Sequence, residues 1–114
     1  MIRAQSRVGA DEELASLLAE LASRVRADEP ECTSYVVTRM MGSNEHFAVH
    51  ARFSSWDAFN AHAETPHLSR VLPRLPALLA TSISMELFLE LAPLRRVVRI
   101  DDARRKVEAE RHRE

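Results

Sequence analysis

A chain of 114 residues with 46% apolar and 29% charged side chains has the size and composition of one globular domain with a single core. Its net charge of −1 at pH 7 argues against a general nucleic-acid binder or a protein that binds membrane surfaces. The single cysteine, Cys32, excludes an internal disulfide, and no apolar run is long enough for a signal peptide or a membrane helix, so we expect a cytoplasmic protein.

The first part of the chain predicts a strand followed by a helix. Residues 2–8 alternate between apolar and polar side chains, as a half-buried strand does, and Gly9 ends the alternation. Asp11 can cap the next element, in which leucines and Val25 recur at helical spacing. We expect this amphipathic helix to end before Pro30.

Residues 33–40 and the stretch that starts at His46 predict a β-hairpin, because a turn sequence at residues 42–44 separates them. The second of these strands alternates strictly, which predicts one apolar and one polar face. The apolar face holds Phe47, Val49, Ala51 and Phe53, and the other face holds His46, Ala48, His50 and Arg52.

A second helical region follows, with Ser54 as the expected N-cap and an apolar stripe of Trp56, Phe59 and Ala63. This stripe predicts that Trp56 lies in the core or in a cavity wall. Thr65 and Pro66 predict the start of another short helix, which we expect to break near Pro73 and to continue as a loose turn to Thr81.

Residues 83–91 alternate once more and predict a fourth strand, before Pro93 ends the compact part of the chain. We therefore expect a domain over residues 1–92. Residues 93–114 are highly charged, and we expect them to form a helical tail, either a solvated or frayed helix or an arm that packs on a partner subunit.

The order β-α-β-β-α-β predicts an α+β fold of the ferredoxin-like type, with a four-stranded antiparallel sheet and helices on one of its faces. The other face is expected to carry Phe88 and Val37 among arginine and glutamate side chains. A sheet face with exposed apolar side chains usually packs against another layer, and a second copy of the chain can supply that layer through a two-fold interface. We therefore expect a homodimer through the sheet.

Several stretches resemble the antibiotic biosynthesis monooxygenase family: residues 24–30 with Cys32 and Tyr35, the strand-to-helix stretch, and Ala61-His62 followed by Pro66-His67-Leu68. The resemblance covers roughly residues 1–92. It implies a dimeric α/β barrel with a ligand cavity between sheet and helices in each subunit. It also implies, as for several members, oxidation of quinols or polycyclic phenols by molecular oxygen with no metal or flavin.

The chain departs from the family pattern at several places. Ala51 and Phe53 stand where members often carry an acidic residue and a tryptophan, and Pro30 is followed by Glu31 where a glycine is usual. The haem-degrading branch needs an asparagine on the first strand, a tryptophan where this chain has His62, and a haem ligand near Leu72. Haem degradation is therefore not expected.

The histidines do not predict a metal site. His46 and His50 would lie about 13 Å apart along a strand, too far to share one ion. His62 and His67 are closer, but no cysteine or carboxylate pair beside them in the sequence completes a ligand set. The chain also has no glycine-rich phosphate loop, which disfavours nucleotide cofactors. Since the family resemblance implies neither metal nor flavin, we expect no cofactor.

Cofactor-free oxygenation needs a dry pocket, a base and hydrogen-bond donors, because a deprotonated phenol can pass an electron directly to oxygen. The candidate catalytic residues are His62, His67 and Tyr35, and the candidate substrate-binding residues are Trp56, Phe53, Phe59 and Arg52. Each of these side chains also has a purely structural interpretation. A non-catalytic homodimer that binds a small aromatic ligand, or none, therefore stays open as the alternative function.

Overall fold

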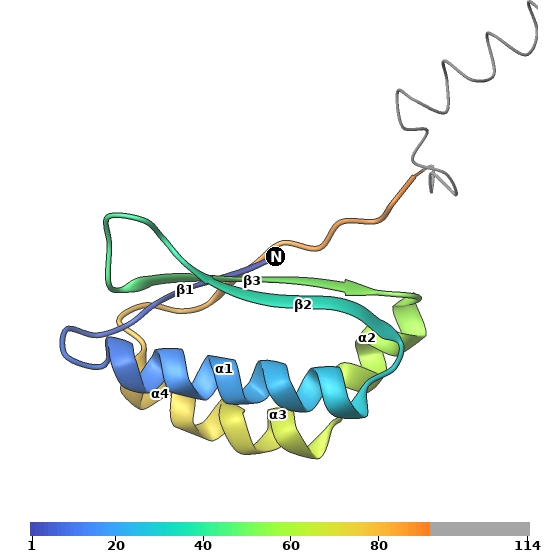
Figure 1. Ribbon diagram of the computed structural model, residues 1–114, viewed down its shortest axis with the longest axis horizontal. Helices are drawn as coiled ribbons and strands as arrows, with labels where there is room; N and C mark the ends of the chain where they lie inside the picture. Colours follow the sequence, from blue (N-terminus) through green and yellow to red (C-terminus); the bar gives the residue numbers. More distant parts are fainter. Residues whose placement is uncertain (92–114) are drawn as a thin grey trace, which may run out of the picture.

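The computed structural model describes residues 1–91, which form one antiparallel sheet with all helices on one face (Figure 1). The charged tail expected over residues 93–114 lies outside the described residues. The elements are β1 (Ile2–Gln5), α1 (Asp11–Asp28), β2 (Cys32–Arg39), β3 (His46–Phe53), α2 (Trp56–Ala63), α3 (Pro66–Val71), the 3₁₀ turn η1 (Leu72–Arg74), α4 (Leu75–Leu78) and β4 (Ser84–Met85).

The strand order in the sheet is β2-β3-β1-β4, and every neighbouring pair is antiparallel. This is the ferredoxin-like arrangement that the order of elements predicted. Val49 of β3 pairs with Val37 on one side and with Ile2 on the other, so these three side chains form a row directed at the helices. Val37 therefore packs on the core, and its neighbour Val36 lies on the uncovered face; the expectation for Val37 was wrong.

The core lies between the sheet and the helices. The leucine stripe of α1 packs against β2 and β3 and against the helical segment that follows α2. The buried apolar residues of the core are Leu14, Leu17, Leu18, Leu21, Ala22, Val25, Tyr35, Phe47, Val49, Val71, Leu75 and Leu78. None of the helices within residues 1–91 has both the length and the apolar character that crossing a bilayer requires.

The first and last strands of the chain, β1 and β4, are shorter than the alternation predicted. Ser84 and Met85 pair with Arg3 and Ile2, and the Glu86 amide donates to the Met1 carbonyl. Beyond Glu86 the chain has passed the beginning of β1, so no neighbouring strand remains for residues 87–91. At its other end, β1 stops at Gln5, and residues 7 and 8 turn away toward α1 instead of continuing the strand.

The helix starts also differ from expectation. Ala10 is the N-cap of α1, and Asp11 lies inside the first turn without capping it. The N-cap of α2 is Ser55, whose Oγ accepts a hydrogen bond from the Ala58 amide at 3.1 Å, whereas the Ser54 hydroxyl donates to the Glu31 carboxylate. The helix thus begins one residue later than predicted.

Trp56 is 63% exposed and is not a core residue. It is the first residue of α2, beyond the end of β3, where no part of the sheet covers it; its ring stacks on Phe59 with centroids 5.4 Å apart. The break predicted at Pro73 is also only local. Pro73 and Pro76 occupy first-turn positions of η1 and α4, where no amide hydrogen is needed, so helical structure continues to Leu78 in place of the loose turn.

Candidate active site

Three polar side chains meet in a buried cluster at the junction of three helix ends. Glu29 is the C-cap of α1, His62 lies in the last turn of α2, and His67 is the second residue of α3. The Glu29 carboxylate contacts His62 Nδ1 at 2.9 and 3.0 Å and His67 Nε2 at 2.6 Å. The three side chains are only 9–11% exposed, so we call them the Glu–His cluster and treat it as the candidate active site.

The backbone on both sides of Glu29 fixes the position of its carboxylate. The Glu29 amide closes the last turn of α1 on the Val25 carbonyl at 2.9 Å, and the Glu29 carbonyl accepts from the Cys32 amide at 3.0 Å at the start of β2. Arg26 strengthens the same junction, because its Nη2 donates to the Tyr35 carbonyl at 2.7 Å. The carboxylate thus projects from a short, well-bonded connection between helix and strand.

The two histidines are held by the turn between α2 and α3. The His62 carbonyl at the end of α2 accepts from the Thr65 hydroxyl at 2.8 Å and from the Thr65 amide at 3.2 Å. Pro66 then occupies the first position of α3, where it needs no amide hydrogen, and His67 follows it. This tight turn brings the imidazole rings within 6.4 Å of each other, measured between ring centroids.

Hydrogen-bond chemistry assigns the tautomers. An ionised carboxylate accepts hydrogen bonds and donates none, so the nitrogens that face Glu29 carry the hydrogens. A neutral His62 then donates through Nδ1 and keeps a lone pair on Nε2. That nitrogen has no hydrogen-bond partner within residues 1–91. The ring of His62 lies beside Phe53 and Tyr35, with centroid distances of 5.2 and 5.9 Å.

Tyr35 lies on β2 directly over the cluster and is 4% exposed. Burial raises the pKa of its hydroxyl to about 12, and the nearby Cys32 and Glu29 act in the same direction. The hydroxyl is therefore a proton-bearing donor near neutral pH and not a base. Burial also raises the pKa of the Cys32 thiol, so this group is not an activated nucleophile.

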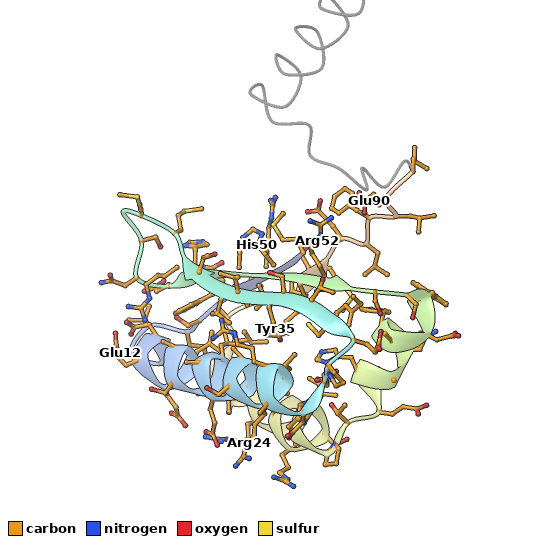
Figure 2. The ribbon with its side chains drawn as sticks, turned by 45° about the vertical axis from the view of Figure 1, so that its right-hand side comes forward. Glu12, Arg24, Tyr35, His50, Arg52 and Glu90 are labelled. Atoms are coloured by element: carbon orange, nitrogen blue, oxygen red, sulfur yellow. The ribbon has the colours of Figure 1, made fainter. Side chains whose placement is uncertain are left out.

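The structure gathers some of the predicted site residues and separates others. His62, His67, Tyr35 and Phe53 meet at the cluster, and Phe59 adjoins it through an edge contact with Phe53 at 5.6 Å. Trp56 reaches this group only through Phe59. Arg52 points away from the helices on the uncovered sheet face and contacts Glu90 at 3.5 Å, so it does not belong to the same site (Figure 2).

Glu29 is the site residue that the sequence analysis missed. A signal was present, because a carboxylate at the C-terminal end of a helix faces the negative end of the helix dipole. Such a position is unfavourable unless the carboxylate has donors elsewhere. The sequence alone does not single out Glu29, because Asp28 and Glu31 are acidic as well. Of these three side chains, the structure directs Glu29 into the protein.

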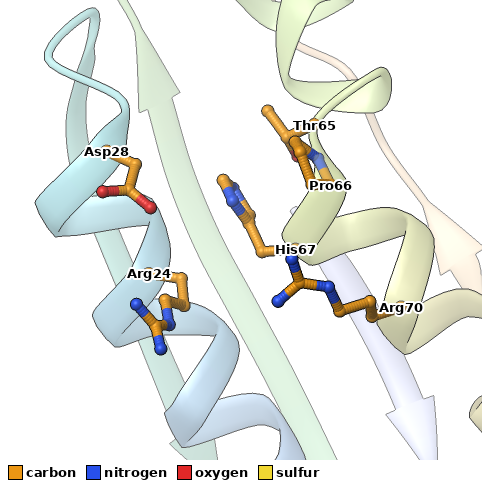
Figure 3. A pocket seen from close by; sticks show the side chains of 6 residues that line it. All are labelled: Arg24, Asp28, Thr65, Pro66, His67 and Arg70. Atoms are coloured by element: carbon orange, nitrogen blue, oxygen red, sulfur yellow. The ribbon is translucent and has the colours of Figure 1, made fainter.

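A groove between α1 and α3 leads to the cluster from the solvent side. It has a volume of about 290 Å³ and is lined by Arg24, Asp28, Thr65, Pro66, His67 and Arg70 (Figure 3). A second hollow of about 170 Å³ shares Arg24, His67 and Arg70 with it and continues along α1. His67 therefore connects the buried carboxylate to an open, cationic groove on the helical side of the molecule.

Comparison with known proteins supports the assignment of the fold. The family described as antibiotic biosynthesis monooxygenase matches residues 1–74, which include every member of the Glu–His cluster. The structure of PA3566 from Pseudomonas aeruginosa is similar, with a TM-score of 0.73, 22% identity, and coverage of 80% of this chain and 90% of that one. A comparison with curated proteins gives no match.

Two further solved structures are similar at the same low identity. Rv0793 from Mycobacterium tuberculosis has a TM-score of 0.68 and 22% identity, over 80% of this chain and 94% of that chain. A protein described as an antibiotic biosynthesis monooxygenase has a TM-score of 0.67 and 21% identity, over 77% of this chain and 95% of that chain. At these identities the likeness establishes the fold alone.

Proposed function

The chain belongs to the antibiotic biosynthesis monooxygenase family, and from this premise we propose that it is a cofactor-independent monooxygenase that oxidises a quinol or a polycyclic phenol with molecular oxygen. One observation carries the proposal beyond the family. His62 is buried beside aromatic rings, its Nδ1 is held by Glu29, and its Nε2 has no partner within residues 1–91. This is the arrangement of an oriented general base.

In the proposed reaction, His62 Nε2 accepts the phenolic proton of the substrate. Glu29 stabilises the positive charge that develops on the imidazole, and His67 holds the carboxylate from its other side. His67 is thus a positioning residue. The neutral Tyr35 hydroxyl donates a hydrogen bond to the new phenolate, while Phe53 and Phe59 supply apolar walls.

The phenolate then passes one electron to oxygen, and the two radicals combine at the activated ring carbon. For an anthrone, the proton that His62 takes comes from the methylene carbon and leaves the same phenolate-type anion. One oxygen atom then becomes the new carbonyl at that carbon, and the other leaves in water with the two methylene hydrogens. The electrons balance without an external reductant. The protein therefore has only to deprotonate the substrate, hold its anion and exclude water.

Oxygen uptake with a panel of hydroquinones and anthrones, in buffer that contains a chelator, tests the proposal. We expect turnover by the wild type and a loss of about 10²- to 10⁴-fold in kcat for His62→Ala, the range for removal of a general base. His50→Ala is the matched control, because His50 lies on the uncovered sheet face, away from the Glu–His cluster, and sedimentation establishes that this variant keeps the oligomeric state of the wild type. Wild-type turnover no faster than that of His62→Ala would contradict the proposal.

The alternative is a homodimer that binds a small aromatic molecule without oxidising it. Two predicted substrate-binding residues are absent from the cluster, which favours this function. Trp56 is exposed, and Arg52 lies on the opposite face of the sheet. Ala51 and Phe53 also replace residues that family members often carry. Saturable quenching of the fluorescence of Trp56 by a phenol, with no oxygen uptake, would support the alternative.

We infer in either case that a second copy of the chain covers the uncovered sheet face. Val36 is exposed there, and Phe88, in the segment that follows β4, is 79% exposed between Glu86 and Glu90. These glutamates pair with arginines of the same face, Arg3–Glu86 at 3.7 Å and Arg52–Glu90 at 3.5 Å. Exposed ion pairs contribute little, so burial of the apolar side chains should dominate the association.

A further inference from the structure

We propose that the Glu–His cluster binds a divalent transition-metal ion of the Zn²⁺ type, and that the bound ion switches off the base function of His62. The three side chains offer ligand atoms that lie within 4.8 Å of one another. We assign these as one oxygen of Glu29 and the ring nitrogens that face it, Nδ1 of His62 and Nε2 of His67. The switch rests on the proposed function, whereas the metal site itself does not.

The donor set matches the chemistry of zinc. Two imidazole nitrogens and one carboxylate oxygen, with a fourth position for water, form one of the ligand sets that proteins use for an open zinc site. Bonds of about 2.0–2.2 Å place tetrahedral donors about 3.3 Å apart. One oxygen, Oε2 of Glu29, already lies 3.0 Å from His62 Nδ1 and 2.6 Å from His67 Nε2, so small side-chain shifts suffice.

The surroundings provide a path and a moderate affinity. His67 lines the groove between α1 and α3, so an ion can enter from solvent, and water can reach the fourth position. Asp28 is an acidic neighbour in this groove, but Arg24 and Arg70 also line it and repel a cation. We therefore expect a dissociation constant on the order of micromolar.

The switch follows from the tautomer of His62. Without an ion, Nδ1 carries the hydrogen that Glu29 accepts, and the lone pair is on Nε2. An ion that binds Nδ1 uses the lone pair of that nitrogen, so the single hydrogen of the neutral ring moves, by exchange with water, to Nε2. Nε2 then donates hydrogen bonds and no longer accepts a phenolic proton. The ion-bound protein is inactive for this reason.

Calorimetric titration of the chelator-treated, full-length protein with Zn²⁺ tests the site. We expect one ion per chain, at least tenfold weaker binding for Glu29→Gln and for His67→Ala, and unchanged binding for the His50→Ala control. Circular dichroism establishes that each variant is folded. For any variant that does not fold, the wild type still decides, since Co²⁺ should give the visible absorption of a tetrahedral site. Equal affinity of the wild type and the variants, or no tetrahedral Co²⁺ signal, would overturn the site.

The switch has its own measurement, which does not depend on turnover. Nitrogen NMR of labelled histidine should show His62 Nε2 changing from an unprotonated to a protonated nitrogen as Zn²⁺ is added. An unchanged Nε2 signal in the ion-bound protein would refute the switch and leave the metal site standing. If oxidation is also observed, Zn²⁺ should inhibit it over the same concentrations, and a chelator should restore it. Absence of oxidation in chelator would refute the proposed function alone.

Discussion

The dependence of unfolding on pH above 9 should report the burial of Tyr35, because few other groups of the chain titrate in this range. The sequence contains one tyrosine, one cysteine and a single lysine, Lys106, while arginines keep their charge throughout the range. Burial raises the pKa of Tyr35 from 10 to about 12 in the folded protein. The unfolded chain therefore loses this proton first as the pH rises above 10, and folding stability falls until the folded protein ionises as well.

The size of the effect follows from the difference between the two pKa values. Each pKa unit corresponds to about 1.4 kcal/mol, so the Tyr35 contribution falls by about 1.4 kcal/mol between pH 9 and pH 11 and by roughly twice that amount above pH 12. Below pH 10 the contribution is fully present. Because burial also raises the pKa of Cys32, the thiol adds a loss of its own as the pH rises above 9. The comparison is therefore made in a Cys32→Ser background, which also removes the part of the Tyr35 shift that the thiolate causes and leaves the larger part that burial causes.

Urea unfolding at pH 9 and pH 11, with and without Tyr35→Phe, gives the free energies. The phenylalanine variant keeps the ring and removes the titrating group, so its stability should fall less between the two pH values, by up to about 1.4 kcal/mol. Ultraviolet titration of the single phenolate provides a direct reading of the same pKa. Equal losses in the two proteins, together with a titration midpoint near 10, would show that Tyr35 is solvated and does not close the cluster.

Three further perturbations test the packing around the site. Ser55→Ala should lower the free energy of unfolding by about 1 kcal/mol through loss of the α2 cap, whereas the reverse ranking with Ser54→Ala would contradict the assignment of that cap. Leu14→Ala should cost about 2–5 kcal/mol in urea unfolding because Leu14 is fully buried; a cost below 1 kcal/mol would mean that α1 is not packed on the sheet. Phe88→Asp should shift the sedimentation of a dimer toward that of a monomer, because it places an unpaired charge in the interface, and a variant that dimerises as before would place the interface elsewhere.

Most of the fold could be predicted because two simple periodicities carry it. The strict alternation in β3 separates Phe47 and Val49 from His50 and Arg52, and the structure places these pairs on opposite faces. The leucine spacing of α1 likewise identified the residues that are buried. Both signals are local, and in both cases burial in the folded protein follows the pattern that the sequence displays.

The incorrect boundaries came from contacts that periodicity does not describe. The alternation of residues 83–91 is that of a strand, but pairing requires a neighbour, and β1 begins at Ile2. Trp56 has the right spacing for the apolar stripe of α2, but burial depends on what lies opposite, and β3 ends before it. A sequence pattern gives the face of a residue and not the extent of the surface that covers it.

The Glu–His cluster joins two distant parts of the sequence, the end of α1 with Glu29 and the α2–α3 turn with His62 and His67, so only their packing brings it together. Glu29 at the C-terminal end of α1 places a negative charge where the helix dipole opposes it, and His62 in the last turn of α2 lies where a dipole favours positive charge. Both features stabilise one added positive charge between them. We propose two forms of that positive charge: a proton that His62 takes from a phenol, and a divalent ion bound to the three donor atoms. The two exclude each other, because an ion on Nδ1 moves the ring hydrogen to Nε2, and Nε2 then has no lone pair for the proton. Glu29→Gln should therefore weaken proton transfer and ion binding together, whereas His50→Ala on the far face of the sheet should change neither.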